Sequence, residues 1–319
     1  MHTTWRLGVA SSAESGNSSD RAGDTSRIGA LMHGVQKSLV KAGVMVTIAA
    51  AILAGQASAG TLDTIKQTHK IRLAYREDAP PFSASGTGAE PVGYVVELCR
   101  AVAASLTAQL DLSRLDIAYV PVTAANRFDM IRQGKADLLC EATSETLDRR
   151  KTVDFSIPTF VDGASLLIRD GGPTSLEALA GRKVGVLGGT TTEEALRNTL
   201  KASSVDATVV LANTHEEGVE FLESGTISAY FADRAILQYL RLDSKDPAKL
   251  FLADNYLTVE LYALALPRGD EDFRLAVDTA LSKIYRSGAI AHIFQASFGK
   301  DVEPSAMVKT LYLISGLQP

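Results

Sequence analysis

The chain has 319 residues, 46% of them apolar and 22% charged, an ordinary globular composition with room for two domains. Its formal net charge is −5 at pH 7, and no lysine- or arginine-rich run is present. A nucleic-acid partner is therefore not expected.

The N-terminal segment has the pattern of an exported protein. Residues 1–31 are rich in serine, glycine and aspartate, and we expect them to be disordered or to be an extension upstream of a true start at Met32. In 32–59, two lysines precede an apolar run at 42–54, which is shorter than the roughly 20 residues of a membrane-spanning helix. An Ala-x-Ala site follows, so we expect a signal peptide cleaved after Ala59 and a periplasmic mature protein.

Beyond residue 59, strand and helix patterns alternate, which predicts mostly parallel α/β sheets. The first half predicts strands at 70–75, 116–122 and 136–140 and helices at 94–110 and 126–133. The second half predicts strands at 183–187, 207–211, 228–231 and 262–266, with helices up to 200 and at 216–223 and 233–240. A helical stretch at 272–298, broken near Gly288, closes the pattern.

The turn at Gly188-Gly189 precedes a predicted helix start. Thr191 and Glu194 have the spacing of a capping box, which places backbone donors at that start. Neither GxGxxG nor GxxxxGK[ST] is present, so a phosphate loop is weakly supported. A carboxylate suits the same geometry, because helix N-termini attract anions.

The most informative stretch is 140–156. It follows the strand 136–140, continues through small and polar residues, and opens a short helix that carries Arg149. A guanidinium matches a carboxylate with two parallel hydrogen bonds, and strand-end carbonyls and a hydroxyl can accept from an ammonium group. A site for the two α-groups of a free amino acid is therefore predicted, although a single arginine is more often an ordinary surface residue.

Several motifs, in this order and spacing over residues 60–299, resemble the family-3 periplasmic solute-binding proteins of ABC importers, in particular the glutamate/aspartate binders. They are Thr61–Lys66, Tyr75–Ser83, Val92–Cys99, Gly134–Asp137, Gly188–Glu193, Phe231–Arg234 and Tyr262–Pro267.

The resemblance implies a two-lobed α/β fold of type II, with the ligand in the cleft between the lobes at the carboxyl ends of both sheets. It implies that lobe 1 consists of 60–164 and 266–319 and that lobe 2 consists of 165–265. The extended segments 160–168 and 259–267 would be the two crossings. A monomer without a cofactor is expected.

By motif position, the resemblance implies that Arg149 binds the α-carboxylate together with Thr190 and Thr191. It implies that Asp233 pairs with the α-amine, although helix N-capping is the alternative role for this aspartate. The Ala142 carbonyl and Ser144 would complete the amine site. Glu141 and Ala142 stand where the acidic binders have Gly-Ser.

Three further positions match residues that bind the ligand's side chain in glutamate/aspartate binders: Arg76, Arg127 and His215. As a set they imply a second carboxylate, because Arg149 and Asp233 already account for the α-groups and leave Arg76, Arg127 and, if it is protonated, His215 without an anion. Ala124 replaces an expected serine. Tyr75 and Phe82 are candidate pocket walls, and Phe82 could equally be core.

Both cysteines, Cys99 and Cys140, match cysteines of the acidic binders, which implies a disulfide in an exported protein; two separate buried thiols are the alternative.

The resemblance implies delivery of an amino acid, glutamate or aspartate, to an ABC permease in the inner membrane. One alternative is a broad polar amino-acid binder. Another is a periplasmic dehydratase of cyclohexadienyl or arogenate type, which shares the fold. No nucleophile–base pair, metal spacing or cofactor loop favours an enzyme. A receptor sensor domain is disfavoured because no membrane segment follows residue 298.

Overall fold

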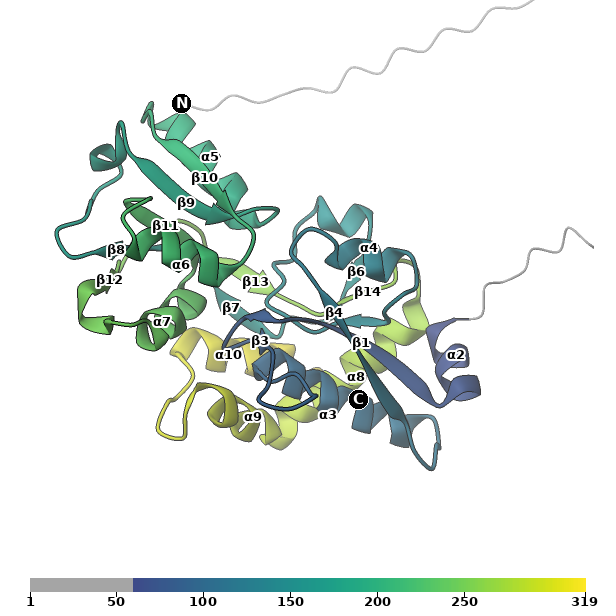
Figure 1. The fold of residues 1–319 in the computed structure, drawn as a ribbon. Coiled ribbons are helices and arrows are strands. Elements are labelled where there is room, and N and C mark those ends of the chain that lie inside the picture. The colour runs from purple at the N-terminus through teal and green to yellow at the C-terminus, as the bar shows by residue number, and fades with distance from the viewer. Residues whose placement is uncertain (1–59) are drawn as a thin grey trace, which may run out of the picture. The chain divides into compact units, whose positions relative to one another are not determined.

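A computed structural model describes residues 60–319 (Figure 1). The predictions for residues 1–31, for the signal peptide at 32–59 and for its cleavage lie outside the described residues. Within residues 60–319, no helix is both long and apolar enough to cross a membrane.

The first sheet has five strands in the order β4-β1-β5-β14-β6. They are β1 (Lys70–Arg76), β4 (Asp116–Val122), β5 (Leu138–Leu139), β6 (Asp154–Phe155) and β14 (Ala265–Leu266). β4, β1 and β5 run parallel, whereas β14 is antiparallel to both of its neighbours. The parallel strands therefore end at one edge of the sheet, where their connections begin.

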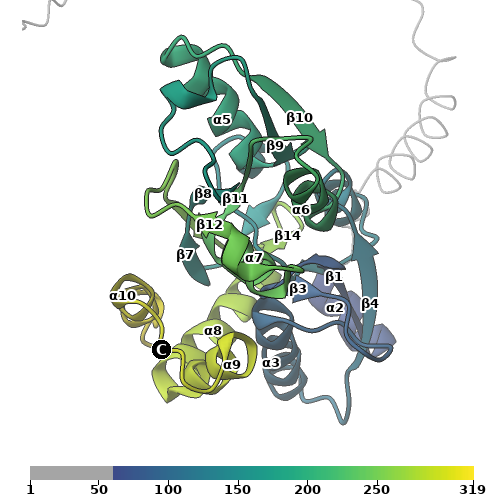
Figure 2. The ribbon, with the colours of Figure 1, turned by 60° about the vertical axis from the view of Figure 1, so that its left-hand side comes forward.

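Six helices belong to the lobe built on this sheet: α2 (Thr61–Thr68), α3 (Tyr94–Gln109), α4 (Arg127–Arg132), α8 (Glu271–Ser287), α9 (Ala289–Phe298) and α10 (Ala306–Ser315). Figure 2 shows α3, α8 and α9 packed together, with the C-terminal α10 beside α8. α3 buries Val95, Leu98, Val102 and Leu106 because their three- and four-residue spacing places them on one face.

The second sheet also has five strands, in the order β10-β9-β11-β8-β12. They are β8 (Ala164–Arg169), β9 (Lys183–Leu187), β10 (Thr208–Ala212), β11 (Ala229–Asp233) and β12 (Leu250–Leu252). β10, β9 and β11 are parallel, and β8 is antiparallel to β11 and β12. Its helices are α5 (Thr191–Ala202), α6 (His215–Glu223) and α7 (Arg234–Asp243).

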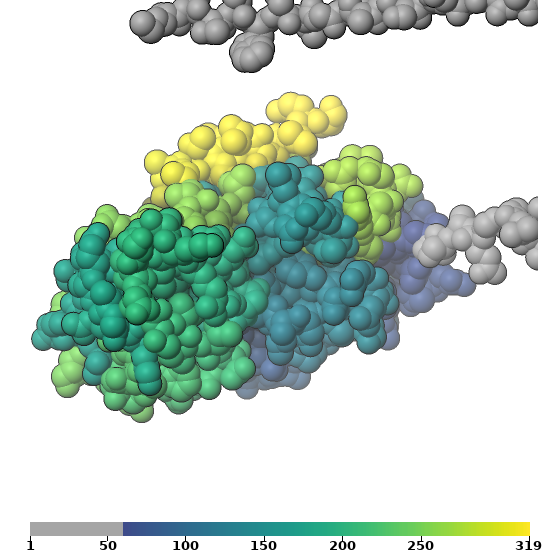
Figure 3. Space-filling view, turned by 90° about the horizontal axis from the view of Figure 1, so that it is seen from above, coloured from purple at the N-terminus to yellow at the C-terminus, as the bar shows by residue number. Residues whose placement is uncertain are grey.

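Two extended segments connect the sheets. β7 (Phe160–Asp162) pairs antiparallel with β13 (Glu260–Tyr262), and together they form a separate two-stranded ribbon. The single strand predicted at 262–266 is therefore two strands, because β13 pairs in this ribbon and β14 in the first sheet. The predicted fold class is confirmed: two lobes, each with a mostly parallel sheet and flanking helices (Figure 1). In the space-filling view, the green residues of the second lobe lie beside the blue residues of the first (Figure 3).

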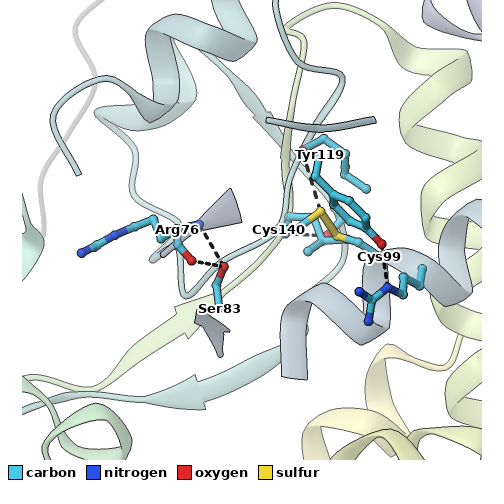
Figure 4. Close-up of a disulfide and its surroundings, with 9 residues drawn as sticks. Arg76, Ser83, Cys99, Tyr119 and Cys140 are labelled. Carbon is cyan, nitrogen blue, oxygen red and sulfur yellow. Dashed lines mark hydrogen bonds between the residues drawn. A yellow bond between two sulfur atoms is a disulfide. The ribbon is translucent and has the colours of Figure 1, made fainter. Parts of the chain in front are cut away.

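The predicted disulfide is confirmed. Cys99 of α3 is bonded to Cys140, the residue that follows β5, and their Cα atoms are 6.1 Å apart (Figure 4). The bridge fixes the helix that covers the first sheet to the segment that leads into the 140–156 stretch.

The aromatic residues proposed as pocket walls lie elsewhere. Phe82 is fully buried among aromatic rings of the first lobe, with its ring centroid 5.0 Å from that of Phe160 and 5.5 Å from that of Tyr262. Tyr75 packs edge-on against Tyr119. Neither lines the cavity between the lobes: Phe82 is part of the core, and Tyr75 lies half-buried beside Tyr119.

Candidate ligand-binding site

One cavity between the two lobes is lined by all nine residues predicted to bind a ligand: Arg76, Arg127, Ala142, Ser144, Arg149, Thr190, Thr191, His215 and Asp233. These residues lie at or just after the carboxyl ends of strands in both sheets. Arg76 and Asp233 are the last residues of β1 and β11, and His215 opens the helix after β10. Parallel strands bring such residues to one edge, which explains why distant sequence motifs meet here.

Arg149 opens a short 3-10 helix (Arg149–Lys151) on the first lobe. Its Nη1 donates to the Ser144 carbonyl at 2.7 Å, and its guanidinium lies 5.0 Å from the centre of the Phe128 ring. Burial lowers the pKa of Arg149, while the nearby carboxylates, with Glu141 foremost, oppose that shift. Among residues 60–319 no carboxylate forms an ion pair with it, so its fork of donors can accept an anion from the cleft.

The start of α5 faces Arg149 from the second lobe. Thr190 caps this helix by accepting from the Glu193 N–H at 3.2 Å, and the Glu193 carboxylate accepts from the Gly189 N–H at 2.9 Å. The capping box is thus one residue earlier than the Thr191–Glu194 pair predicted, because Thr190, not Thr191, has the extended N-cap backbone. The free N–H groups of the first turn attract anions.

Asp233 takes the N-cap position of α7, but its side chain makes no capping hydrogen bond. Instead Oδ1 lies 3.5 Å from the Thr192 hydroxyl, and the residue lines the cavity. Burial, followed by the carboxylates of Asp162 and Glu260, raises the pKa of Asp233 to about 7. A cation in the cleft would stabilise its ionised form.

Arg76 and Arg127 have anionic partners in the protein, which corrects the expectation that they lack one. Arg76 forms a forked pair with Asp78, with Nη2 2.6 Å from Oδ1 and Nε 2.9 Å from the same oxygen. The Nε of Arg127 lies 3.1 Å from Oε1 of Glu141. Burial lowers the pKa of Arg127 to about 10, so the guanidinium remains charged at neutral pH.

His215 is buried and neutral. Burial and then the Arg76 charge lower its pKa to about 3, which outweighs the opposing effect of Asp78. Its Nδ1 lies 3.0 Å from the Tyr230 hydroxyl, and its backbone N–H donates to Asp78 at 3.2 Å. The suggestion that His215 is protonated is therefore wrong.

Hydrogen bonds cross the cleft directly. The hydroxyls of Ser144 and Thr191 are 3.2 Å apart, and the Thr191 hydroxyl also donates to Glu260 of β13 at 2.7 Å. Arg127 Nη2 donates to the Gly189 carbonyl at 3.4 Å. Together with the His215–Asp78 contact, they hold the lobes in a closed arrangement in which both sets of cavity residues face one point.

Three polar residues that line or adjoin the cavity were not predicted from the sequence: Asp78, Glu141 and Thr192. Nothing in the sequence marks Asp78 as a site residue, because an acidic residue two positions after an arginine is equally typical of a surface turn. The sequence does mark Glu141, since it replaces a small residue of the acidic binders. Within residues 60–319, no three histidine, cysteine or acidic side chains are grouped to hold a metal ion.

The sequence of this chain is similar to those of known binding proteins. Residues 71–300 match the family described as bacterial extracellular solute-binding proteins, family 3. The L-glutamate/L-aspartate-binding protein of Pseudomonas aeruginosa is 28% identical over 86% of this chain and 91% of its own length. The glutamate/aspartate import solute-binding protein of Escherichia coli is also 28% identical, over 79% of this chain and 83% of its own.

Among solved structures, the ancestral amino acid-binding protein AncCDT-1, a precursor of cyclohexadienyl dehydratase, has a TM-score of 0.65 at 24% identity. The alignment covers 75% of this chain and 99% of that chain. At this identity the likeness establishes the fold alone.

Proposed function

We propose that this chain, which belongs to the family-3 bacterial extracellular solute-binding proteins, captures a free L-amino acid and delivers it to the permease of an ABC importer. The observation that carries the proposal is that Arg149 of one lobe and Asp233 of the other line the same cavity. One is a guanidinium without an ion-pair partner among residues 60–319, and the other is a carboxylate that caps no helix.

In this proposal the ligand's α-carboxylate lies between Arg149 and the start of α5, where Thr190 and Thr191 supply hydroxyl and backbone donors. Its α-ammonium lies against Asp233, and Ser144 and the Ala142 carbonyl accept from it. The two lobes contribute opposite halves of this site, so the ligand stabilises the closed arrangement over the open one. Closure is then the state that a permease can recognise.

We further propose that the chain works in the periplasm after removal of its signal peptide. The apolar run and the Ala-x-Ala site of 32–59 support export, and the disulfide fits an oxidising compartment. N-terminal sequencing of protein from a periplasmic extract should begin at Gly60.

The named relatives and the charges in the cavity favour different side chains for the ligand. Relatives named for glutamate and aspartate favour an acidic ligand, but they are only 28% identical. The acidic ligand predicted from the sequence was expected to neutralise Arg76, Arg127 and His215. In the structure both arginines have an anionic partner within the protein and His215 is neutral, so this reason no longer holds.

The proposal is tested by isothermal titration calorimetry of residues 60–319, unfolded and refolded to strip any bound ligand, against the twenty common L-amino acids. We expect at least one to bind with a Kd in the micromolar range or below. A protein that binds none at millimolar concentration, or that instead converts arogenate or prephenate, would favour the dehydratase alternative.

A further inference from the structure

Glu141 is a buried carboxylate inside the candidate site. It follows Cys140 at the end of β5, its exposed fraction is 1%, and it lines the cavity. Oε1 lies 3.1 Å from Nε of Arg127, and Oε2 lies 3.9 Å from Nη1 of Arg76. The Thr143 hydroxyl donates to Oε1 at 2.5 Å. The carboxylate is thus held between the two arginines predicted to bind a side-chain carboxylate of the ligand.

The charges at this end of the cavity cancel. Arg76 and Arg127 carry two positive charges, and Asp78 and Glu141 carry two negative ones. His215, the remaining titratable lining residue here, is neutral near pH 7. At this end of the cavity, closing the lobes therefore leaves no uncompensated cation for a side-chain carboxylate of the ligand to neutralise.

A second carboxylate at this position would be repelled. It would lie beside the Glu141 carboxylate in a cleft shielded from water, and like charges that share a buried site disfavour ionisation of one of them. An amide avoids this penalty. Its oxygen can accept from a guanidinium N–H and its NH2 group can donate to the Glu141 carboxylate, so both resident charges remain paired.

We propose that Glu141 determines specificity, and that the cleft prefers amino acids with an uncharged, hydrogen-bonding side chain, glutamine and asparagine above all, over glutamate and aspartate. This inference rests on the proposed capture of a free amino acid. The carboxylate of Glu141, a residue of the protein itself, lies between Arg76 and Arg127, where the side-chain carboxylate of an acidic ligand would otherwise bind.

The experiment compares the Kd of glutamine and of glutamate for four proteins by calorimetry at pH 7.5. They are the wild type, Glu141→Gln, Glu141→Gly and the control Glu220→Gln, which neutralises an exposed glutamate of α6. The wild type should bind glutamine at least tenfold more tightly than glutamate. Both substitutions of Glu141 should strengthen glutamate binding at least tenfold, because Arg127 then lacks an anion, whereas Glu220→Gln should leave the ratio unchanged.

If the wild type binds glutamate as tightly as glutamine, the inference is wrong. This comparison needs no variant, so it holds even if a Glu141 variant fails to fold. The inference is also overturned if a correctly folded Glu141→Gln, judged by its circular dichroism, keeps the wild-type ratio. A wild type that binds only apolar amino acids contradicts the inference but supports amino-acid capture. Failure of every amino acid to bind any of the four proteins contradicts the proposed function itself.

Discussion

Arg149 differs from the other arginines of the cleft in having no ion pair among residues 60–319. Arg76 and Arg127 are held by Asp78 and Glu141, whereas Arg149 is oriented by a carbonyl and by the Phe128 ring. An arginine that is held in place without being neutralised can bind an incoming carboxylate with little reorganisation.

Replacing Arg149 by alanine should weaken amino-acid binding about 30- to several-thousand-fold, because the buried α-carboxylate loses its partner, at about 2–5 kcal/mol. Lysine should not restore the affinity, since an ammonium lacks the planar fork. Calorimetry measures both. Arg150→Ala, which removes the exposed neighbour, is the control and should bind like the wild type. Wild-type affinity of Arg149→Ala would remove this residue from the site.

Asp233 should make binding depend on pH. The pKa of its carboxyl is raised to about 7 in the ligand-free protein. In the proposed binding mode the ligand's ammonium pairs with the ionised form. Below pH 7 the ligand must displace a proton, so the affinity should fall by about tenfold between pH 8 and pH 6, and it should level off above pH 8.

In Asp233→Asn, binding should be weaker at pH 8 and nearly flat from pH 8 to pH 6. Asp162, whose pKa is raised to about 6, is present in both proteins, so the difference between the two pH profiles isolates Asp233. An unchanged pH profile in Asp233→Asn would show that another group binds the amine.

The element that carries Arg149 depends on the disulfide and its surroundings. Cys140 connects β5 to the segment of Glu141, Ala142 and Ser144, and its bond to Cys99 fixes that segment to α3. At the end of the neighbouring strand β1, the Arg76 backbone exchanges two hydrogen bonds of 2.9 Å with the Ser83 hydroxyl (Figure 4). The first-lobe half of the site is thus anchored at two points.

Loss of the disulfide should destabilise the protein. A bridge between residues 41 apart is worth roughly 3–4 kcal/mol in the loop-entropy description. The double variant Cys99→Ala/Cys140→Ala should therefore unfold at lower urea concentration than the oxidised wild type. A reductant should shift the wild type towards the variant and leave the variant unmoved, and thiol titration of the denatured, unreduced wild type should find no free thiol. Two free thiols would contradict the bridge.

Elements with a strong pattern were predictable to within a residue or two. The strands 116–122 and 183–187 were predicted with the bounds that the structure has, because alternating or continuous apolar residues mark them. The strand predicted at 136–140 is only Leu138–Leu139, and the one at 262–266 divides. Which sheet a residue joins depends on pairing partners far away in the chain, which periodicity does not encode.

The site was predictable as a set of positions but not as a balance of charges. Motif order brought all nine predicted residues to one cavity, since each lies at the end of a strand or in the connection that follows it. The pairing of Glu141 with Arg127 and the neutrality of His215 depend on burial and on distances below 4 Å. Such distances follow from how the folded segments pack, which the order of the motifs does not encode.

In the molecule as a whole, the candidate ligand site lies where the two lobes meet. Arg149 belongs to one lobe and Asp233 to the other, and the β7–β13 ribbon is the paired connection between them. Direct contacts between the lobes include three hydrogen bonds across the cleft and the apolar side chain of Ile236 in α7, which packs with the core of the first lobe. In the proposed binding mode, a ligand that bridges Arg149 and Asp233 adds contacts that only the closed arrangement provides, and this requires both of its α-groups.

The most direct measurement of this requirement uses truncated ligands and the unmodified protein. Calorimetry of residues 60–319 would compare the tightest-binding L-amino acid with its D-enantiomer and with analogues that lack the α-carboxylate or the α-amine; for glutamine the analogues are 4-aminobutanamide and 4-carbamoylbutanoic acid. Each removal should weaken binding at least about 30-fold, because it leaves Arg149 or Asp233 buried without its partner. An analogue that lacks either α-group and binds as tightly as the intact amino acid would contradict the account.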